Sequence, residues 1–357
     1  MNTSLHPTSL RRALPFGRLV KSILLAKGDL LAARAFAEGQ AWSDTPSVAI
    51  ALKAAVTALS NPSALSYTEA VAGEFLALVR ARSILGRVTG LRRVPMNTSM
   101  LRVAGGPTAS WVAQGSPLPI SKFSLERDAL GVFKIGAAIV VTDELMVAAG
   151  EVADLAFASE LVRAVAAFED RQFLDPGQSA VADASPGSIT AGLTPIVSSG
   201  SSADQVRADI AKLFAAFDAA DGAFDSAVIA MHPRTAVYMG QLTTTNGGLL
   251  YPRLGARGGD VLGVPALVSS ALELTNSPGE AYMAMFDPQQ VLFGENEDVA
   301  IDVATYAALQ LDGAPSAGAQ QLVSLWENGL RAVKLVRELA WKLTSSSGAA
   351  VLTEIQY

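Results

Sequence analysis

The chain of 357 residues contains no cysteine. This excludes a disulfide framework, cysteine zinc ligands and a cysteine nucleophile, and it fits a reducing compartment. Histidine is nearly absent as well, since only His6 and His232 occur. His232 lies in the segment Met-His-Pro-Arg, where a strand is predicted to give way to a helix. We interpret it as a capping residue rather than a catalytic one.

Long apolar runs are also missing. The best one, Ile135 to Thr142, is flanked by Lys134 and Asp143 and is far shorter than the roughly 20 residues that span a bilayer. The apolar segment of residues 14–26 is interrupted by Arg18 and Lys21, and no clean cleavage site follows it, so it is a poor secretory signal. We therefore expect a cytosolic protein with no membrane partner.

Charged residues are scarce, at 17%, whereas hydrophobic residues make up 50% of the chain. The mean hydropathy of +0.33 is high for a soluble monomer. With the membrane excluded, this composition predicts that apolar surface is buried against other subunits.

The charges that are present, with a formal net charge of −6, are unevenly distributed. Residues 1–37 have a net charge of +5, residues 80–102 contain six arginines and no acid, and residues 258–330 contain ten acids and no Lys or Arg. Such segregation indicates faces with different partners, although ordinary solvated faces would give the same pattern. On the first interpretation, the candidates for contact with nucleic acid are Arg11, Arg12, Arg18 and Lys21, together with the arginines of residues 80–102. Such contact would be independent of base sequence and sensitive to salt. For the basic N-terminal helix, packing on a partner subunit is the favoured alternative.

One long helix is predicted from Glu151 to Gly177. An apolar stripe repeats at helical spacing, and Pro176 with Gly177 ends the helix because proline donates no amide hydrogen bond and glycine tolerates left-handed geometry. The stripe comprises Phe157, Leu161, Ala164, Val165 and Phe168. Residues 8–60 predict short helices separated at Pro15, Gly28, Gly39 and Pro46, and a further helix is predicted at residues 68–82.

Residues 104–130 predict a long hairpin with a Gly/Pro-rich bend. Such an arm has little core of its own and would be stabilised by lying on a neighbour. Trp111 lies within it, and a core residue and an intersubunit anchor are both consistent with its position.

We find little catalytic chemistry. The chain has no phosphate-binding P-loop and no GxSxG motif. Glu169 and Asp170 are adjacent in a helix and point about 100° apart, so they do not form an acid/base pair; we interpret them as ion-pairing residues at a subunit contact. Glu295, Glu297 and Asp298 could bind a divalent cation, but a solvated turn is the favoured interpretation. We expect no enzyme activity, no cofactor and no metal.

The order of motifs resembles the major capsid protein family of tailed bacteriophages, which has the HK-97-like fold. The resemblance covers about three quarters of the chain, from Ser83 onwards. Seven segments carry it: Ser83-Ile84-Leu85 to Val94-Pro95; Trp111-Val112-Ala113-Gln114-Gly115 with Pro117 to Pro119; Val140 to Leu145; Ala166 to Gly177; Met231-His232-Pro233-Arg234-Thr235; Leu262-Gly263-Val264-Pro265; and Met285-Phe286-Asp287.

The resemblance implies an α+β subunit with four parts. These are a helical N-terminal arm (1–82), a peripheral domain with the long spine helix and antiparallel strands (83–103, 131–190 and 297–343), an extended hairpin loop (104–130) and an axial domain (191–296 and 344–357). We expect the N-terminal arm to be retained rather than cleaved. The candidates for subunit interfaces are Trp111, Gln114, Lys122, Arg163, Glu169, Asp170 and Arg171. In the member of this family that crosslinks its shell, a loop lysine reacts; here Leu118 aligns with that lysine and Lys122 is offset, so covalent crosslinking is not expected.

The resemblance implies a major head protein that self-assembles into pentamers and hexamers of an icosahedral shell around double-stranded DNA. Its partners would be further copies of itself, the packaged DNA, and portal, scaffold, maturation-protease or decoration proteins. Its location would be the virion capsid, assembled in the cytoplasm of the bacterial host. Two alternatives remain at this point: the shell of an encapsulin-like nanocompartment, and an oligomeric metal-dependent enzyme that uses the carboxylates of residues 295–298.

Overall fold

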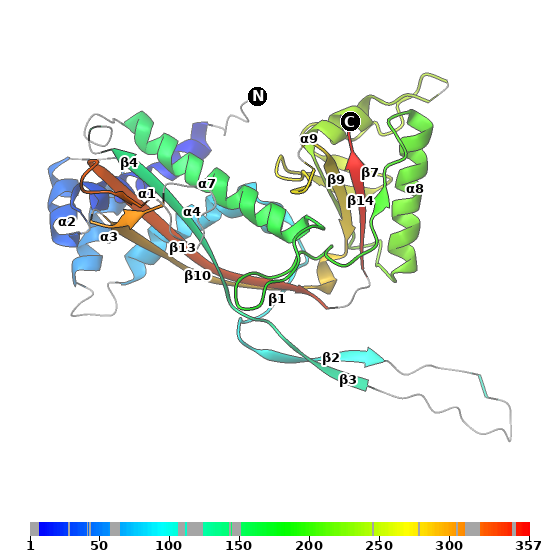
Figure 1. The fold of residues 1–357 in the computed structure, drawn as a ribbon, viewed down its shortest axis with the longest axis horizontal. Coiled ribbons are helices and arrows are strands. Elements are labelled where there is room, and N and C mark those ends of the chain that lie inside the picture. The colour runs from blue at the N-terminus through cyan, green and yellow to red at the C-terminus, as the bar shows by residue number, and fades with distance from the viewer. Residues whose placement is uncertain are drawn as a thin grey trace. The chain divides into compact units, whose positions relative to one another are not determined.

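The computed structural model describes residues 7–27, 29–40, 42, 44–57, 65–105, 111–112, 124–142, 144, 151–244, 246–277, 279–304, 306–310, 322–344 and 348–357. The chain divides into two compact units. Unit 1 comprises Met1–Arg87, Lys134–Arg171 and Asn296–Glu338. Unit 2 comprises Val88–Phe133, Gln172–Glu295 and Leu339–Tyr357. Figure 1 shows the helices and strands that form them.

Most helices of unit 1 come from the first part of the chain. They are α1 (Pro7–Leu25), α2 (Leu30–Gly39), α3 (Pro46–Thr57), α4 (Leu65–Arg82) and the short α5 (Ile84–Arg87). Asp29 caps α2, since its carboxylate accepts a hydrogen bond of 2.9 Å from the amide of Leu31. Pro15 was predicted to end a helix, but it is buried inside α1. Packing of that helix against its neighbours has therefore overridden the local preference of proline.

The helices of residues 1–82, which the resemblance implied to be an arm, pack into unit 1. Phe16 of α1 stacks on Phe75 of α4 with ring centroids 4.5 Å apart. The same apolar cluster contains Val48, Leu161 and Val333, which come from α3, from the long helix α7 (Glu151–Leu174) and from β13 (Leu330–Leu343). The apolar faces of these helices are thus covered by the unit's own residues, so the segment is part of a folded core.

A four-stranded sheet has the order β1-β10-β13-β4. Its strands are β1 (Arg92–Arg93), β10 (Val291–Ala304), β13 and β4 (Phe133–Thr142). The unit boundaries fall inside β10, β13 and α7. A smaller antiparallel pair is formed by β11 (Ala308–Leu309) and β12 (Val323–Ser324).

The predicted hairpin is present as an antiparallel ribbon of β2 (Ser99–Gly105) and β3 (Ser124–Ala129), with Ser99 opposite Ala129 and Val103 opposite Leu125. In the described residues this ribbon forms a sheet of two strands only. Two strands without a third are marginally stable in water. The ribbon therefore fits an element that is completed by contact with a partner.

Unit 2 is built on a mixed sheet of the order β5-β14-β9-β6-β8-β7. The strands are β5 (Ile196–Val197), β6 (Val228–Met231), β7 (Gly259–Val261), β8 (Val264–Val268), β9 (Ala281–Phe286) and β14 (Ala349–Ile355). Every residue of the central strand β9 is buried. The helices α8 (Ala203–Ala219) and α9 (Pro233–Gln241) contribute Ile210, Leu213, Phe217 and Met239 to the same core.

The ends of α8 and α9 are set by their capping residues. Ser202 and Gln205 form a reciprocal capping box at the start of α8. His232 precedes Pro233 at the start of α9, and its Nδ1 accepts a hydrogen bond of 3.1 Å from the amide of Arg234. Burial lowers the pKa of His232, and the charge of Glu273 opposes this only in part. The capping role predicted for His232 is confirmed, because an unprotonated nitrogen is needed to accept this bond.

The long helix α7 ends where the sequence predicted. Asp175 is fully buried, and its carboxylate accepts hydrogen bonds from the amide of Gly177 at 2.9 Å and from the amide of Thr275 at 3.2 Å. Proline at position 176 cannot continue the helical hydrogen bonding. Asp175 therefore joins the end of α7 to the loop after β8.

Asp209 of α8 is fully buried and holds the segment that follows β5. Its carboxylate accepts hydrogen bonds of 2.6 Å from the amide and 2.8 Å from the hydroxyl of Ser199, and Lys212 Nζ lies 3.0 Å away. Burial alone raises the pKa of this carboxyl, but the bonds from Ser199 and the charge of Lys212 outweigh it. The net effect is a pKa below the ordinary value of 3.8.

Replacing Asp209 with asparagine is expected to lower the free energy of unfolding at neutral pH by about 1–3 kcal/mol. The folded-state pKa is lower than the unfolded one, so the charged group stabilises the fold above about pH 4 and loses this effect as the pH falls through the folded pKa. The variant should therefore lose less stability than the parent below about pH 4 in denaturation measured across pH. Asp204→Asn, at the exposed first turn of α8, is the control. Equal acid sensitivity of parent and Asp209→Asn would contradict the assignment.

Candidate assembly surfaces

Glu169 and Asp170 are each 1% exposed and bind groups of their own chain. The carboxylate of Glu169 forms an ion pair with the guanidinium of Arg337 on β13, which is also 1% exposed. Asp170 Oδ1 accepts a hydrogen bond of 2.6 Å from the amide of Ile84 at the start of α5. The prediction that these two acids form a subunit contact is therefore wrong in this structure, because both carboxylates are used inside unit 1.

The exposed surface of α7 is formed by other residues. Phe168, which was predicted to belong to the apolar stripe, is 51% exposed, and Ala164 is exposed as well, whereas Leu161 and Val165 are buried. Arg163 and Arg171 are exposed, and Arg163 forms an ion pair with Glu160 one helical turn earlier. Arg163 and Arg171 thus remain proposed interface residues, now together with Phe168.

Trp111 has an exposed fraction of 104%, so its side chain contacts essentially none of the residues that the structure describes. Its neighbour Val112 is exposed too. A core role for Trp111 is excluded within the described residues, which leaves the anchor interpretation as the proposal. The other two loop candidates, Gln114 and Lys122, lie outside the described residues.

The basic N-terminal residues are less available than predicted. Arg18 is 5% exposed, its guanidinium lies 2.6 Å from Asp44, and it lies over the ring of Trp42 with 5.0 Å to the ring centroid. It is therefore not a DNA-facing residue of this structure. Lys21 is half-buried, and the side chains of Arg11 and Arg12 lie outside the described part of the chain.

The acidic and basic stretches of the sequence meet in unit 2. Arg93 forms an ion pair of 2.8 Å with Glu295, so one member of the proposed metal-binding group of residues 295–298 is already paired. The side chains of Glu297 and Asp298 lie outside the described residues. Among the residues that are described, no group of three or more His, Asp or Glu could hold a metal ion.

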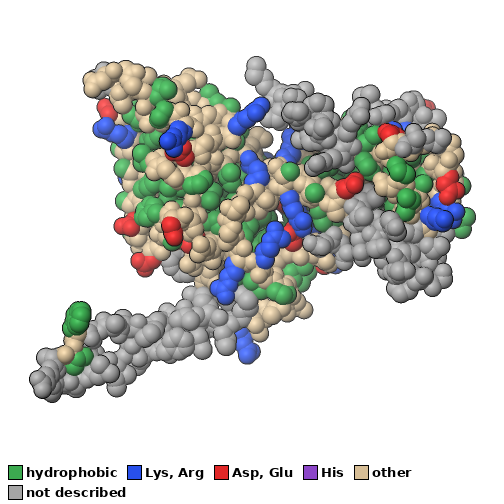
Figure 2. Space-filling model, turned by 180° about the vertical axis from the view of Figure 1, so that it is seen from behind, with side chains coloured by type: hydrophobic (Ala, Val, Ile, Leu, Met, Phe, Trp, Pro, Cys, Tyr) green, Lys and Arg blue, Asp and Glu red, His purple; other side chains and the backbone are tan. Residues whose placement is uncertain are grey.

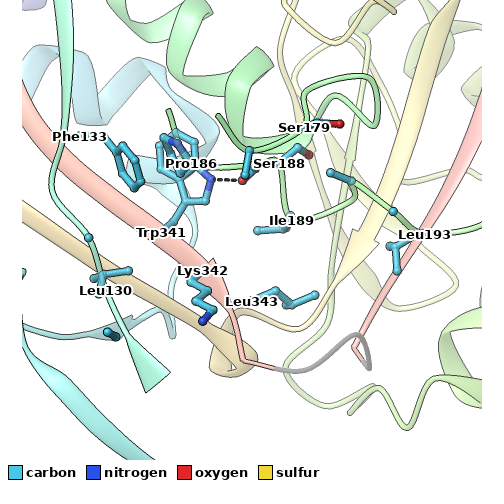
Figure 3. Close-up of a pocket in the computed structure, with 16 residues that line it drawn as sticks. Leu130, Phe133, Ser179, Pro186, Ser188, Ile189, Leu193, Trp341, Lys342 and Leu343 are labelled. Carbon is cyan, nitrogen blue, oxygen red and sulfur yellow. Dashed lines mark hydrogen bonds between the residues drawn. The ribbon is translucent and has the colours of Figure 1, made fainter. Parts of the chain in front are cut away.

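A pocket of about 600 Å³ lies in unit 2 (Figure 3). Trp341, Phe133 and Ile189 supply apolar walls, and the indole nitrogen of Trp341 donates a hydrogen bond of 2.9 Å to the carbonyl oxygen of Gly187. Lys342, Ser188 and Ser179 are the polar lining residues that Figure 3 labels. No histidine or carboxylate is among the lining residues, and the basic side chain that lines the pocket is Lys342.

Apolar side chains are exposed on both units, and Figure 2 shows them between scattered charged ones on one face. The most exposed besides Trp111 are Leu31, Leu262, Tyr306, Leu322 and Trp326. Sequence patterns did not predict that these residues are exposed, because exposure depends on contacts between segments that are distant in the sequence. No helix among the described residues is long and apolar enough to cross a bilayer.

A long helix packed on long strands, a second unit around a mixed six-stranded sheet and a two-stranded hairpin together define the HK-97-like capsid fold. The α+β class predicted from the sequence is thus confirmed. Solved chains support it: one from Gordonia phage Cozz superposes with a TM-score of 0.55 at 15% identity, covering 76% of this chain and 86% of that chain. One from Mycobacterium phage Bobi gives 0.53 at 16% identity, covering 76% and 90%.

The sequence comparisons identify the family. The model of the phage capsid family matches residues 68–327, and the chain belongs to that family. The capsid polyprotein of Pseudomonas phage PAJU2 is 34% identical over 295 residues, which are 80% of this chain but 44% of that protein. The chain thus spans less than half the length of this relative. The major capsid protein of Klebsiella oxytoca phage phiKO2 is 24% identical over 343 residues, covering 90% of this chain and 74% of that protein.

Proposed function

We propose that this chain is the head subunit that builds an icosahedral phage shell from pentamers and hexamers around double-stranded DNA. The observation that carries the proposal is the match of the phage capsid family over residues 68–327. The exposed side chains of Trp111, Leu262 and Trp326 fit it, because a subunit of a shell buries such groups against other copies. A structural role, without catalysis, is what the family and the fold support.

The encapsulin-like alternative shares this fold but encloses a cargo enzyme instead of a genome. The relatives reported above are phage capsid proteins, which favours the phage head. Nothing in the described part of the chain supports the metal-dependent enzyme, since Glu295 is paired with Arg93. The location that follows is the virion capsid, with assembly in the cytoplasm of the bacterial host.

Further partners belong to the same proposal. A shell that is filled with DNA needs a portal and a means of setting its size, so portal, scaffold, maturation-protease and decoration proteins are the expected partners. Contact with packaged DNA would use basic side chains without reading base sequence. Arg11 and Arg12 remain the candidates, together with Lys21. Crosslinking of filled shells to their DNA should then recover peptides from residues 1–37, and recovery restricted to residues 258–330 would contradict this assignment.

Electron microscopy of the expressed full chain tests the proposed function directly. We expect closed particles hundreds of ångströms across, on the scale set by many copies of a 37.0 kDa subunit. Particles that are isolated from infected or induced cells should contain double-stranded DNA. A small oligomer at all concentrations would contradict the proposal, and shells that contain a cargo enzyme would favour the encapsulin-like alternative.

A further inference from the structure

Two exposed residues of unit 2 have left-handed backbone although they carry large side chains. Leu262 has φ 53° and Glu354 has φ 59°. Three of the other four non-glycine residues with positive φ are asparagine or aspartate, which tolerate this conformation. Backbone strain of this kind is retained mostly where it serves a function. Leu262 and Glu354 are therefore the positions of unit 2 at which backbone strain indicates a functional role.

Leu262 forms the tip of the hairpin between β7 and β8. Val261 pairs with Val264, so Leu262 and Gly263 alone make the turn, and both have positive φ. Such turns favour Asn-Gly or Asp-Gly. Here Asp260 and Gly263 supply the turn chemistry, since Asp260 Oδ2 accepts a hydrogen bond of 3.2 Å from the amide of Gly263. The side chain of Leu262 does not stabilise the turn. It places a side chain that is 68% exposed at the edge of the sheet.

Glu354 lies towards the opposite edge of the same sheet. The strand order puts β7 at one edge and β5 with β14 at the other. Strand β14 pairs with β5 at Leu352 and Thr353. A bulge follows, and Glu354 is exposed within it. Strand β14 therefore extends beyond the end of the short strand β5. An edge of this kind is suited to contact with another chain.

A pocket of about 480 Å³ opens beside this second edge. Val237, Tyr238, Gln356 and Tyr357 are among its lining residues. The rings of Tyr238 and Tyr357 lie 4.8 Å apart, and the hydroxyl of Tyr238 donates a hydrogen bond of 2.7 Å to the carbonyl oxygen of Ser201. This bond fixes Tyr238, whose half-buried ring lies against the buried ring of Tyr357, and Val237 in the same lining is exposed.

We propose that Leu262 of one copy inserts into the Val237–Tyr238–Tyr357 pocket of the next copy, so that unit 2 closes rings in a head-to-tail manner. The two contact surfaces lie on different edges of one sheet, which makes the contact heterologous, and a heterologous contact closes into a ring when its rotation allows it. The occupant is thus a second copy of this chain. This inference rests on the proposed function and names the contact that would hold each pentamer and hexamer together.

The charges at the two edges are complementary. Arg257 is exposed in the loop that leads into β7, and Glu354 is exposed towards the opposite edge of the sheet. Neither residue forms an ion pair within the described residues. In a head-to-tail ring, Arg257 of one copy would approach Glu354 of the next. Such a charge pair favours the head-to-tail orientation of the two copies more than it strengthens their binding.

A pair of engineered cysteines tests the contact, because the natural chain has none. Assembled particles of the double variant Leu262→Cys with Val237→Cys are oxidised and run on a denaturing gel without reductant. We expect a ladder of multiples of 37.0 kDa that ends at five and six copies and collapses on reduction. Leu262→Cys with Phe224→Cys, which places the second thiol on an exposed aromatic outside the pocket, is the control and should give no ladder.

Several results would overturn the inference while leaving the proposed function intact. Intact particles without intersubunit bonds would do so, as would dimers of Leu262→Cys alone, because they require two copies of Leu262 to meet. A ladder that continues beyond six copies would place the contact between rings instead of within them. The proposed function fails on different results, namely if the unmodified chain forms only small oligomers or shells that contain a cargo enzyme.

A second variant separates the contact from the fold. Leu262→Gly removes the side chain and suits the left-handed backbone, so the unfolding temperature of the free subunit should stay the same or rise. The concentration needed for half-assembly should increase at least tenfold, whereas Leu262→Met should assemble like the parent. Normal assembly of Leu262→Gly would contradict the proposal.

Discussion

Replacement of Glu169 with alanine is expected to lower the free energy of unfolding by about 3–5 kcal/mol, which is enough to unfold many domains. The reason is the buried guanidinium of Arg337, whose ion pair with Glu169 joins β13 to α7 inside unit 1. Removal of the carboxylate leaves a positive charge in an interior from which water is excluded. Urea denaturation of unassembled subunits measures the loss.

Two variants show whether the charge or the packing is responsible. Glu169→Leu combined with Arg337→Met replaces the pair by apolar side chains of similar size and should recover most of the lost stability. Glu160→Ala removes an exposed acid from the same helix, where the ion pair with Arg163 is worth at most about 1 kcal/mol. If Glu169→Ala unfolded like the parent and failed only in assembly, the sequence-based prediction of a subunit contact would be correct after all.

The position of α7 could be read from the sequence, but its orientation could not. Helical spacing and the Pro176–Gly177 stop are local signals, and they placed the helix within a few residues of Glu151–Leu174. Which face is buried depends on distant partners. Glu169 pairs with a residue 168 positions later and Asp170 with one 86 positions earlier, so no short window of sequence contains either contact. The two acids point in different directions and are buried against different elements.

The same reasoning explains the errors in the first part of the chain. The breaks predicted at Gly39 and Pro46 agree with the end of α2 and the start of α3. The errors concern the break predicted at Pro15 and the DNA contact predicted for Arg18. Both residues are buried in α1, where the cluster around Phe16 and Phe75 decides their environment. The charge of Arg18 is offset by Asp44, which lies in the connection between α2 and α3. A count of charges along the sequence cannot show that a particular arginine is already paired.

Replacement of Trp111 with alanine is expected to have the opposite profile, namely loss of assembly without loss of subunit stability. The side chain is fully exposed, so the free subunit should have the unfolding curve of the parent. Tryptophan is the residue type most enriched among contacts that dominate interfaces, where truncation commonly costs about 2 kcal/mol or more. With one such contact for each subunit, the concentration needed for half-assembly should rise at least about 30-fold.

Light scattering during assembly and electron microscopy of the products measure this effect, and the urea curve of the unassembled subunit is recorded beside them. Trp111→Phe keeps an apolar aromatic group and should recover part of the loss, while Val181→Ala, at another exposed apolar position, should assemble normally. The β2–β3 ribbon has two strands in the described chain, so its hydrogen-exchange protection should increase on assembly in the parent and remain low in Trp111→Ala. If Trp111→Ala formed shells at the same protein concentration as the parent, Trp111 would not be an intersubunit anchor. Any contact of the hairpin with a neighbouring subunit would then be made by its backbone.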